Sequence, residues 1–166
     1  PFGLPTNYKP LKSGLPCRFI QKIGLKYAKE GDVVDAKRML NKWKVLIPKA
    51  PIAGQTDLSN PIRFYHEKNT IISKPGECCT ESWIVAGNFD SKYEAESFKS
   101  YLFTKIVRFL ILQTVISQDV NRKNFAFVPH LDNYDQVFSD KILKKKWKIS
   151  EEEWNYIDSK ILETGK

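Results

Sequence analysis

The sequence predicts an α+β fold in which short, mostly antiparallel strands pack against three or four helices in a single domain. The chain has 166 residues, which is enough for one well-packed core and short for two. Hydrophobic residues make up 42% and aromatic residues 13% of it, so the chain is expected to fold. Short apolar runs predict strands, and two capping-box motifs ahead of amphipathic stretches predict helices.

Strands dominate the prediction for the first half of the chain. Apolar and other residues alternate over residues 23–28, which is typical of a half-buried strand. Asp32 is placed to cap a short helix over residues 33–43. Residues 45–47 then form a buried strand that ends at Pro48. Residues 70–73 and 82–86 flank a Pro-Gly turn, and this arrangement predicts a hairpin-like pair.

Helices dominate the prediction for the second half. Ser91 and Glu94 have capping-box spacing, and the apolar periodicity that follows predicts one helix reaching about Ile116. A short strand is expected over residues 125–128, and a short basic helix over residues 140–147. Ser150-Glu-Glu-Glu153 is a second capping box, which opens the last helix with acidic residues that complement its dipole.

The excess of basic residues has two possible explanations, which are an anionic partner and solubility alone. The formal net charge is +8. Residues 1–50 carry 11 Lys and Arg against 3 Asp and Glu, and residues 101–150 carry 9 against 4. A folded surface with a cationic side attracts polyanions and releases their counterions. The same charge would also keep a protein soluble, and composition alone leaves both interpretations open.

Reaction centres and membrane spans are not indicated by the sequence. It contains no Gly-rich phosphate loop, nucleophile elbow or H-E-x-x-H motif. The three cysteines lack zinc-ligand spacing, and we interpret the adjacent Cys78 and Cys79 as reduced, buried residues. His130, Asp132 and Asp135 are better explained by a turn than by a metal site. The longest apolar run, residues 106–116, is interrupted by polar side chains and is too short to span a bilayer.

Three groups of polar and basic residues are candidates for nucleic-acid contact. Lys105 and Arg108 are three residues apart on the predicted central helix, so they project from one side of it. The loop 118–124 combines amide and cationic donors, which suit base edges and phosphates. The loop 50–68 is long and polar for a plain connection. A solvated face and ordinary polar turns are the alternative interpretations of the same residues.

Several sequence blocks, taken in order, resemble one protein family. The blocks are Pro1-Phe2-Gly3, residues 43–49, residues 75–81, Phe89-Asp90 with Glu94 and Glu96, residues 100–110, residues 127–129 and the tail from Lys146 to Ile157. In their order and spacing, they are similar to the C-terminal target-recognition region of bacterial adenine-specific DNA methyltransferases of type II/IIG restriction-modification systems. The match is weakest over residues 5–40 and 50–70.

The resemblance implies a division of labour within a longer polypeptide. Residues 1–166 would form a DNA target-recognition domain with no catalysis and no cofactor of its own. An upstream domain would bind S-adenosylmethionine and methylate adenine N6, in the bacterial cytoplasm and without membrane contact. The expected partners are double-stranded DNA and that methyltransferase domain. The expected phosphate contacts are Lys49, Lys105, Arg108 and Lys123, and the base-edge candidates are Gln55, Asn60, Arg63, Gln118, Asn121 and Arg122.

Two other functions remain open at this point. The chain could be a protein-interaction domain that docks on its own methyltransferase, with its basic surface against an acidic patch. It could also be a fused metal-dependent nuclease, which needs two or three carboxylates and a lysine around a divalent cation. Glu94 and Glu96 are close in sequence but diverge on a helix, which makes the nuclease the weaker alternative.

Overall fold

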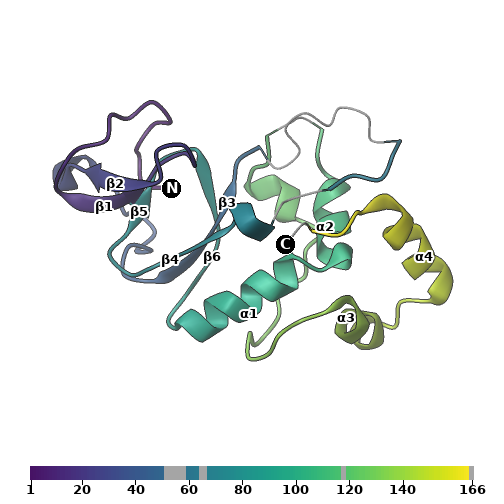
Figure 1. Ribbon diagram of the computed structural model, residues 1–166. Coiled ribbons are helices and arrows are strands. Elements are labelled where there is room, and N and C mark those ends of the chain that lie inside the picture. The colour runs from purple at the N-terminus through teal and green to yellow at the C-terminus, as the bar shows by residue number, and fades with distance from the viewer. Residues whose placement is uncertain (51–58, 64–66, 117–118, 165–166) are drawn as a thin grey trace. The chain divides into compact units, whose positions relative to one another are not determined.

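A computed structural model of the chain describes residues 1–50, 59–63, 67–116 and 119–164. Within these residues it contains four α-helices and two three-stranded sheets (Figure 1). The predicted α+β class is therefore confirmed. The chain divides into two compact units, which are described separately below. Unit 1 comprises Pro1–Lys49 and Asn69–Ala95, and unit 2 comprises Ala50–Lys68 and Glu96–Lys166.

The first sheet of unit 1 has the strand order β2-β1-β5. Strand β1 (Leu15–Arg18) pairs antiparallel with β2 (Leu25–Ala28) and parallel with β5 (Cys78–Cys79). Gly24, with a φ of +73°, closes the β1–β2 connection, a backbone conformation that favours glycine. The parallel pairing between β1 and β5 extends over only two residue pairs. It is consequently a short junction between segments that are far apart in the sequence.

The second sheet of unit 1 is antiparallel and centred on β3 (Trp43–Pro48). Its neighbours are β4 (Ile71–Ser73) and β6 (Trp83–Phe89), in the order β4-β3-β6. The strands predicted near residues 45–47, 70–73 and 82–86 are thus present. The predicted pairing of the last two as a hairpin is wrong, because β3 lies between them. The central residues of β3 are fully buried, as expected for a strand paired on both sides.

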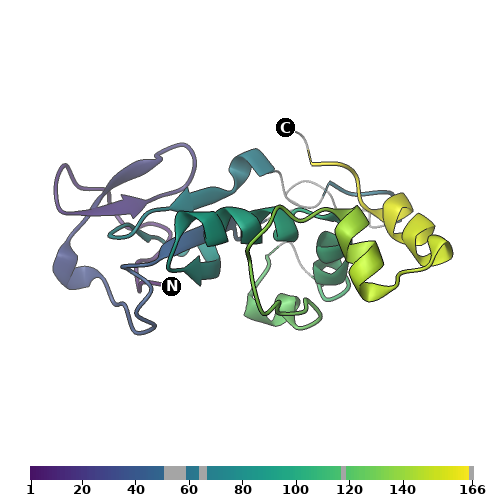
Figure 2. The same ribbon diagram turned by 90° about the horizontal axis from the view of Figure 1, so that it is seen from below.

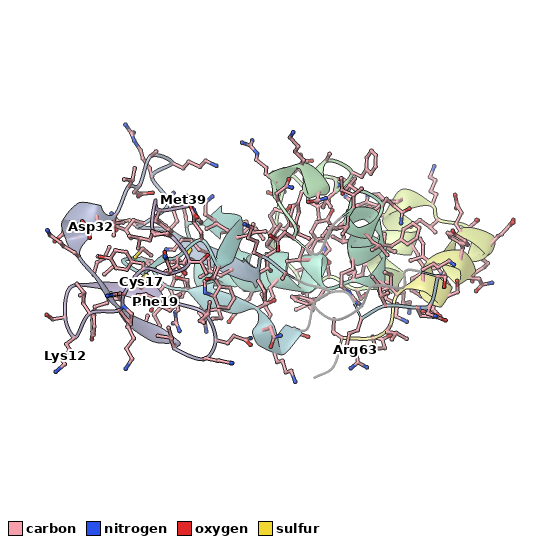
Figure 3. The ribbon with its side chains drawn as sticks, turned by 90° about the horizontal axis from the view of Figure 1, so that it is seen from above. Lys12, Cys17, Phe19, Asp32, Met39 and Arg63 are labelled. Atoms are coloured by element: carbon pink, nitrogen blue, oxygen red, sulfur yellow. The ribbon has the colours of Figure 1, made fainter. Side chains whose placement is uncertain are left out.

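The hydrophobic core of unit 1 joins residues from both sheets. Phe2, Phe19, Met39 and Trp83 belong to one buried cluster, and Figure 3 labels Phe19 and Met39 beside Cys17 of the same cluster. The Trp83 indole Nε1 donates a hydrogen bond of 2.7 Å to the Phe19 carbonyl oxygen. This bond satisfies the one polar atom of the buried indole.

The helix predicted over residues 33–43 is not formed. A 3₁₀ turn, η1, covers Glu30–Asp32, and irregular turns follow. Asp32 accepts a hydrogen bond from the Tyr8 hydroxyl at 2.8 Å instead of capping a helix. The Asp35 carboxylate accepts bonds from the backbone N–H groups of Met39 and Leu40, at 2.7 and 2.8 Å. Side-chain bonds of this kind offer the backbone an alternative to helix formation.

Four α-helices follow β6 within the described residues, and Figure 2 shows the last two leading toward the C-terminus. Ser91 and Glu94 form the predicted capping box before α1, with Glu94 Oε2 accepting from Ser91 N at 3.0 Å. The helices predicted over residues 140–147 and after Ser150 are also confirmed. The helices are α1 (Lys92–Leu102), α2 (Lys105–Leu112), α3 (Asp140–Trp147) and α4 (Glu151–Lys160).

The single long helix predicted from Ser91 to Ile116 is divided into two. Thr104 is extended, with φ −60° and ψ 149°, and its hydroxyl accepts a bond from Val107 N as the N-cap of α2. The extended backbone of Thr104 interrupts the helical conformation after α1. Its side chain then stabilises the start of α2 by satisfying a free backbone donor. The short strand predicted over residues 125–128 is also wrong. A 3₁₀ helix, η3 (Arg122–Phe125), occupies its first residue and turns follow.

Candidate nucleic-acid interface

Arg108, predicted to contact phosphate, is buried on α2. Its side chain is 1% exposed. Its Nε donates to the Phe103 carbonyl at 3.2 Å, and its Nη1 donates to the Leu162 carbonyl at 2.9 Å. Burial lowers the pKa of Arg108 to about 10, against the attraction of Asp140, Glu163 and Glu67. The guanidinium therefore stays charged at neutral pH, and it links α2 to the end of the chain.

Lys105, one turn before Arg108, is engaged in ion pairs. Its Nζ lies 2.6 Å from Asp158 Oδ1 and 3.1 Å from Glu163 Oε1. Its burial lowers the pKa of the ammonium, but the bonds to Asp158 and Glu163 outweigh this and leave the pKa above its ordinary 10.5. The side chain of Asp158 is 48% exposed and that of Glu163 is 82% exposed, so the pairs are partly screened by solvent.

Asp140 fixes the start of α2 within unit 2. This residue begins α3, and its carboxylate accepts bonds from the backbone N–H groups of Lys105 and Ile106, at 3.1 and 3.0 Å. A carboxylate at this position satisfies free donors and complements the helix dipole. Both cations of α2 are thus buried and bonded within unit 2, whereas the predicted phosphate contacts require exposed side chains.

The loop around η3 leaves two of its predicted residues exposed. The Asn121 side-chain oxygen accepts a bond from Lys123 N at 2.9 Å, and Asn121 forms a capping box with Asn124. This oxygen is therefore already bonded to the backbone of η3. Arg122 and Lys123 are exposed, and no hydrogen bond or ion pair of their side chains occurs within the described part of the chain. These two cations remain candidates for DNA contact. Gln118 lies outside the described residues.

The candidates from the loop 50–68 and its flank are separated between the two units. Lys49 is exposed and follows β3 in unit 1. Asn60 and Arg63 are exposed in unit 2, and the Arg63 Nε donates to the Glu163 carbonyl at 3.1 Å. Figure 3 shows the labelled Arg63 at the edge of its unit. Gln55 lies outside the described residues.

Helix α3 carries a cationic surface that was not included among the predicted contact residues. Lys141 and Lys145 are exposed one turn apart, and Lys148 follows at the left-handed C-cap with φ 54°. Lys146 is exposed as well. Within the residues that the structure describes, none of these four side chains forms an ion pair. The run Lys144-Lys145-Lys146 is the signal in the sequence that indicates such a surface.

A shallow hollow accompanies these lysines between α3 and α4. It has a volume of about 430 Å³, and its lining includes Lys141, Lys145 and Trp154. Lys144 lies over the Trp154 ring, 4.9 Å from its centroid, and its Nζ is 3.0 Å from Glu151 Oε1. Cations beside an aromatic side chain can accept both a phosphate and an apolar group. We refer to Lys141, Lys145, Lys146 and Lys148 as the α3 lysine surface.

Neither metal ligation nor membrane insertion is indicated within the described ranges. No group of three or more His, Cys, Asp and Glu side chains there is arranged to hold a metal ion. None of the helices formed by those residues has the length and apolarity needed to cross a bilayer.

Comparison with known proteins does not identify a relative. No family model matches the sequence, and neither a curated protein nor a solved structure matches it.

Proposed function

We propose that this chain binds double-stranded DNA and provides target recognition for an adenine-N6 DNA methyltransferase of a type II/IIG restriction-modification system. Methyl transfer from S-adenosylmethionine would be carried out by another domain of the same polypeptide, in the bacterial cytoplasm. The methyltransferase part of the proposal rests on the sequence resemblance. The DNA-binding part rests on the α3 lysine surface, which replaces the α2 cations as the expected site of phosphate contact.

The α3 lysine surface suits a polyanion because two of its cations, Lys141 and Lys145, share one side of a rigid helix. Lys141 and Lys145 are four residues apart, which corresponds to about 6 Å along a helix axis. Lys148 adds a further exposed charge at the C-cap of the helix, where the backbone is left-handed. Since no described carboxylate neutralises them, their charge is available to phosphate oxygens. Binding would then release counterions, so the affinity should fall steeply as salt is added.

Sequence selection would come from donors able to reach base edges. Arg122 is exposed beside Lys123 on η3, and arginine pairs with two acceptors of guanine in the major groove. Asn60 and Arg63 remain further candidates in the same unit. A phosphate-contacting lysine should affect all duplexes alike, whereas a base-reading arginine should affect one position of the site.

The test is a titration of a fluorescent duplex, followed by anisotropy at several salt concentrations. The double variant K145Q/K148Q should bind at least about tenfold more weakly, with a salt slope lower by about 2. The matched control K37Q/K68Q removes the same two charges from exposed residues elsewhere, so the formal net charge falls from +8 to +6 in both. Equal weakening by both pairs would show that only overall charge matters, and no binding at low salt would refute the proposal.

A second candidate function is docking against the methyltransferase domain of the same polypeptide. It is favoured by exposed apolar side chains on and beside the β1–β2 hairpin, including Ile20, Ile23, Leu25 and Tyr27. Leu25 and Tyr27 are two residues apart on β2 and share one face. A chain that ignores duplex DNA in the titration but binds the methyltransferase domain would support this second function instead.

A further inference from the structure

Two of the three cysteines are brought together by the parallel pairing in unit 1. Cys17 of β1 is the register partner of Cys78 of β5, although the two are 61 positions apart in the sequence. Neighbouring strands lie about 4.8 Å apart, and this spacing falls within the usual Cα separation of a disulfide. Directly paired residues also present their side chains to the same face of a sheet. Both thiols are free and fully buried.

The third cysteine is excluded from this pair by the strand geometry. Cys79 follows Cys78 on β5, and successive side chains of a strand point to opposite faces. The register partner of Cys79 is Arg18, which extends to Glu77 with its Nε 3.0 Å from Glu77 Oε2. Burial raises the pKa of Cys79 to about 12. Cys79 is therefore an inert core residue and serves as an internal control.

The surroundings of the pair favour a thiolate on Cys78. A hydrogen bond with Cys17 is the main cause that lowers the pKa of Cys78, against the opposing effect of burial, and the Lys44 ammonium lowers it further. Lys44 is fully buried, and its Nζ donates to the carbonyls of Leu40, Lys42 and Lys74 at 3.0, 2.6 and 3.0 Å. The same hydrogen bond raises the pKa of Cys17. A hydrogen bond between the two thiols agrees with their placement as register partners on adjacent strands.

We propose that Cys17 and Cys78 are a redox modification site, where a soluble disulfide such as oxidised glutathione converts the two thiols into a reversible intrachain disulfide. During folding, one of the two cysteines, as its thiolate, attacks a glutathione sulfur, which forms a mixed disulfide and releases one glutathione. The other cysteine, as its thiolate, then attacks the protein sulfur of that mixed disulfide and displaces the second glutathione. The two cysteines lose two electrons and two protons, and the two glutathione thiols gain them. The new bond joins β5 to β1, whose pairing spans only two residue pairs.

Oxidative refolding tests the site without requiring a reagent to reach buried sulfurs. The reduced chain is unfolded in guanidinium and returned to native buffer with a glutathione redox couple. The reaction is then quenched by alkylation, and disulfides are mapped by mass spectrometry. We expect a Cys17–Cys78 linkage whose abundance at the same redox ratio exceeds that in guanidinium by at least about tenfold. The C79S variant should retain this linkage, and C17S should yield no intrachain disulfide involving Cys78.

Two results would overturn the proposal. One is recovery of the native circular dichroism spectrum with all three thiols free at every redox ratio. The other is a mixture in which linkages to Cys79 are as frequent as the Cys17–Cys78 linkage. Both results come from the unmodified sequence, so they hold even if C17S or C79S fails to fold. Neither result depends on DNA binding, so failure of the disulfide proposal would leave the proposed DNA-binding function untouched.

Discussion

Helices α2 and α3 are both eight residues long and both carry cations one turn apart, yet they place these cations in opposite environments. On α2, Lys105 and Arg108 are buried and bonded to carboxylates and carbonyls. On α3, Lys141 and Lys145 are exposed and unpaired among the described residues. The spacing of charged residues therefore does not indicate whether they face solvent.

The difference follows from the remaining residues of each helix. All the other residues of α2, from Ile106 to Leu112, are apolar, so the helix buries most of its circumference and takes its cations with it. In α3, Leu143 is the one fully buried residue, and Lys141 and Lys145 lie on the opposite side. A helix that is apolar all round has no solvated face on which to display a charge. Each buried cation then needs partners from other elements.

The largest expected effect comes from removing the buried guanidinium. R108M leaves the Phe103 and Leu162 carbonyls without their donor, so we expect it to lower the free energy of unfolding by about 3 kcal/mol or more. Urea denaturation followed by circular dichroism measures the change. The matched variant R122M removes an exposed arginine and should stay within about 0.5 kcal/mol of the parent chain. Similar losses for both variants would mean that Arg108 does not stabilise the core.

A smaller effect is expected from the residue that connects the two helices. D140A removes the acceptor of the Lys105 and Ile106 backbone N–H groups, so it should lower the free energy of unfolding by about 1–3 kcal/mol. Amide hydrogen exchange should also accelerate in the first turn of α2. The exposed Asp132 provides the control D132A, which should leave both measurements almost unchanged. Unaltered exchange in α2 after D140A would contradict the capping role.

The smallest effect concerns Lys105, and it should depend on pH. K105M should lower the free energy of unfolding by about 1 kcal/mol or less, because both carboxylate partners are partly solvated. The folded-state pKa lies above the ordinary 10.5, so this contribution is complete below pH 10.5 and disappears as pH rises through the folded-state pKa.

Urea titrations of the parent chain and K105M at pH 7, 9 and 11 would measure this difference. The matched variant K145M on α3 should change stability by no more than about 0.5 kcal/mol at pH 7 and pH 9. A difference between parent and K105M that grows at alkaline pH would have the wrong sign for an ion-paired lysine.

Local signals in the sequence predicted the fold class and many of its elements. The capping boxes at Ser91 and Ser150 and the basic helix over residues 140–147 were correct because caps and periodicity act over a few residues. The predictions failed where contacts between residues far apart in the sequence determine the structure. The break at Thr104 depends in part on Asp140, and the order β4-β3-β6 depends on strands that are not adjacent in sequence.

The candidate site was predicted less well than the fold. The sequence shows which residues are cationic. It does not show that Arg108 is buried and bonded to the carbonyl of Leu162, because that partner is 54 residues later in the sequence. Arg122 and Lys123 are exposed as the prediction required, and their role in DNA contact stays a prediction. The Cys17–Cys78 pairing was missed for the same reason as Arg108, since β1 and β5 are neighbours only in the folded sheet.

The interleaved order of the two units has a consequence for synthesis on the ribosome. Every residue assigned to unit 1 has been made once Ala95 is added, so its two sheets can form early. Residues 59–63 have then already been made, but Ile62 pairs with Ile161 and Arg63 bonds to the Glu163 carbonyl. This segment must wait for Glu163, which is made 68 residues after Ala95. A nascent chain whose Ala95 has left the ribosome before Ile161 is made would therefore carry a complete unit 1 and a segment that still lacks its partners.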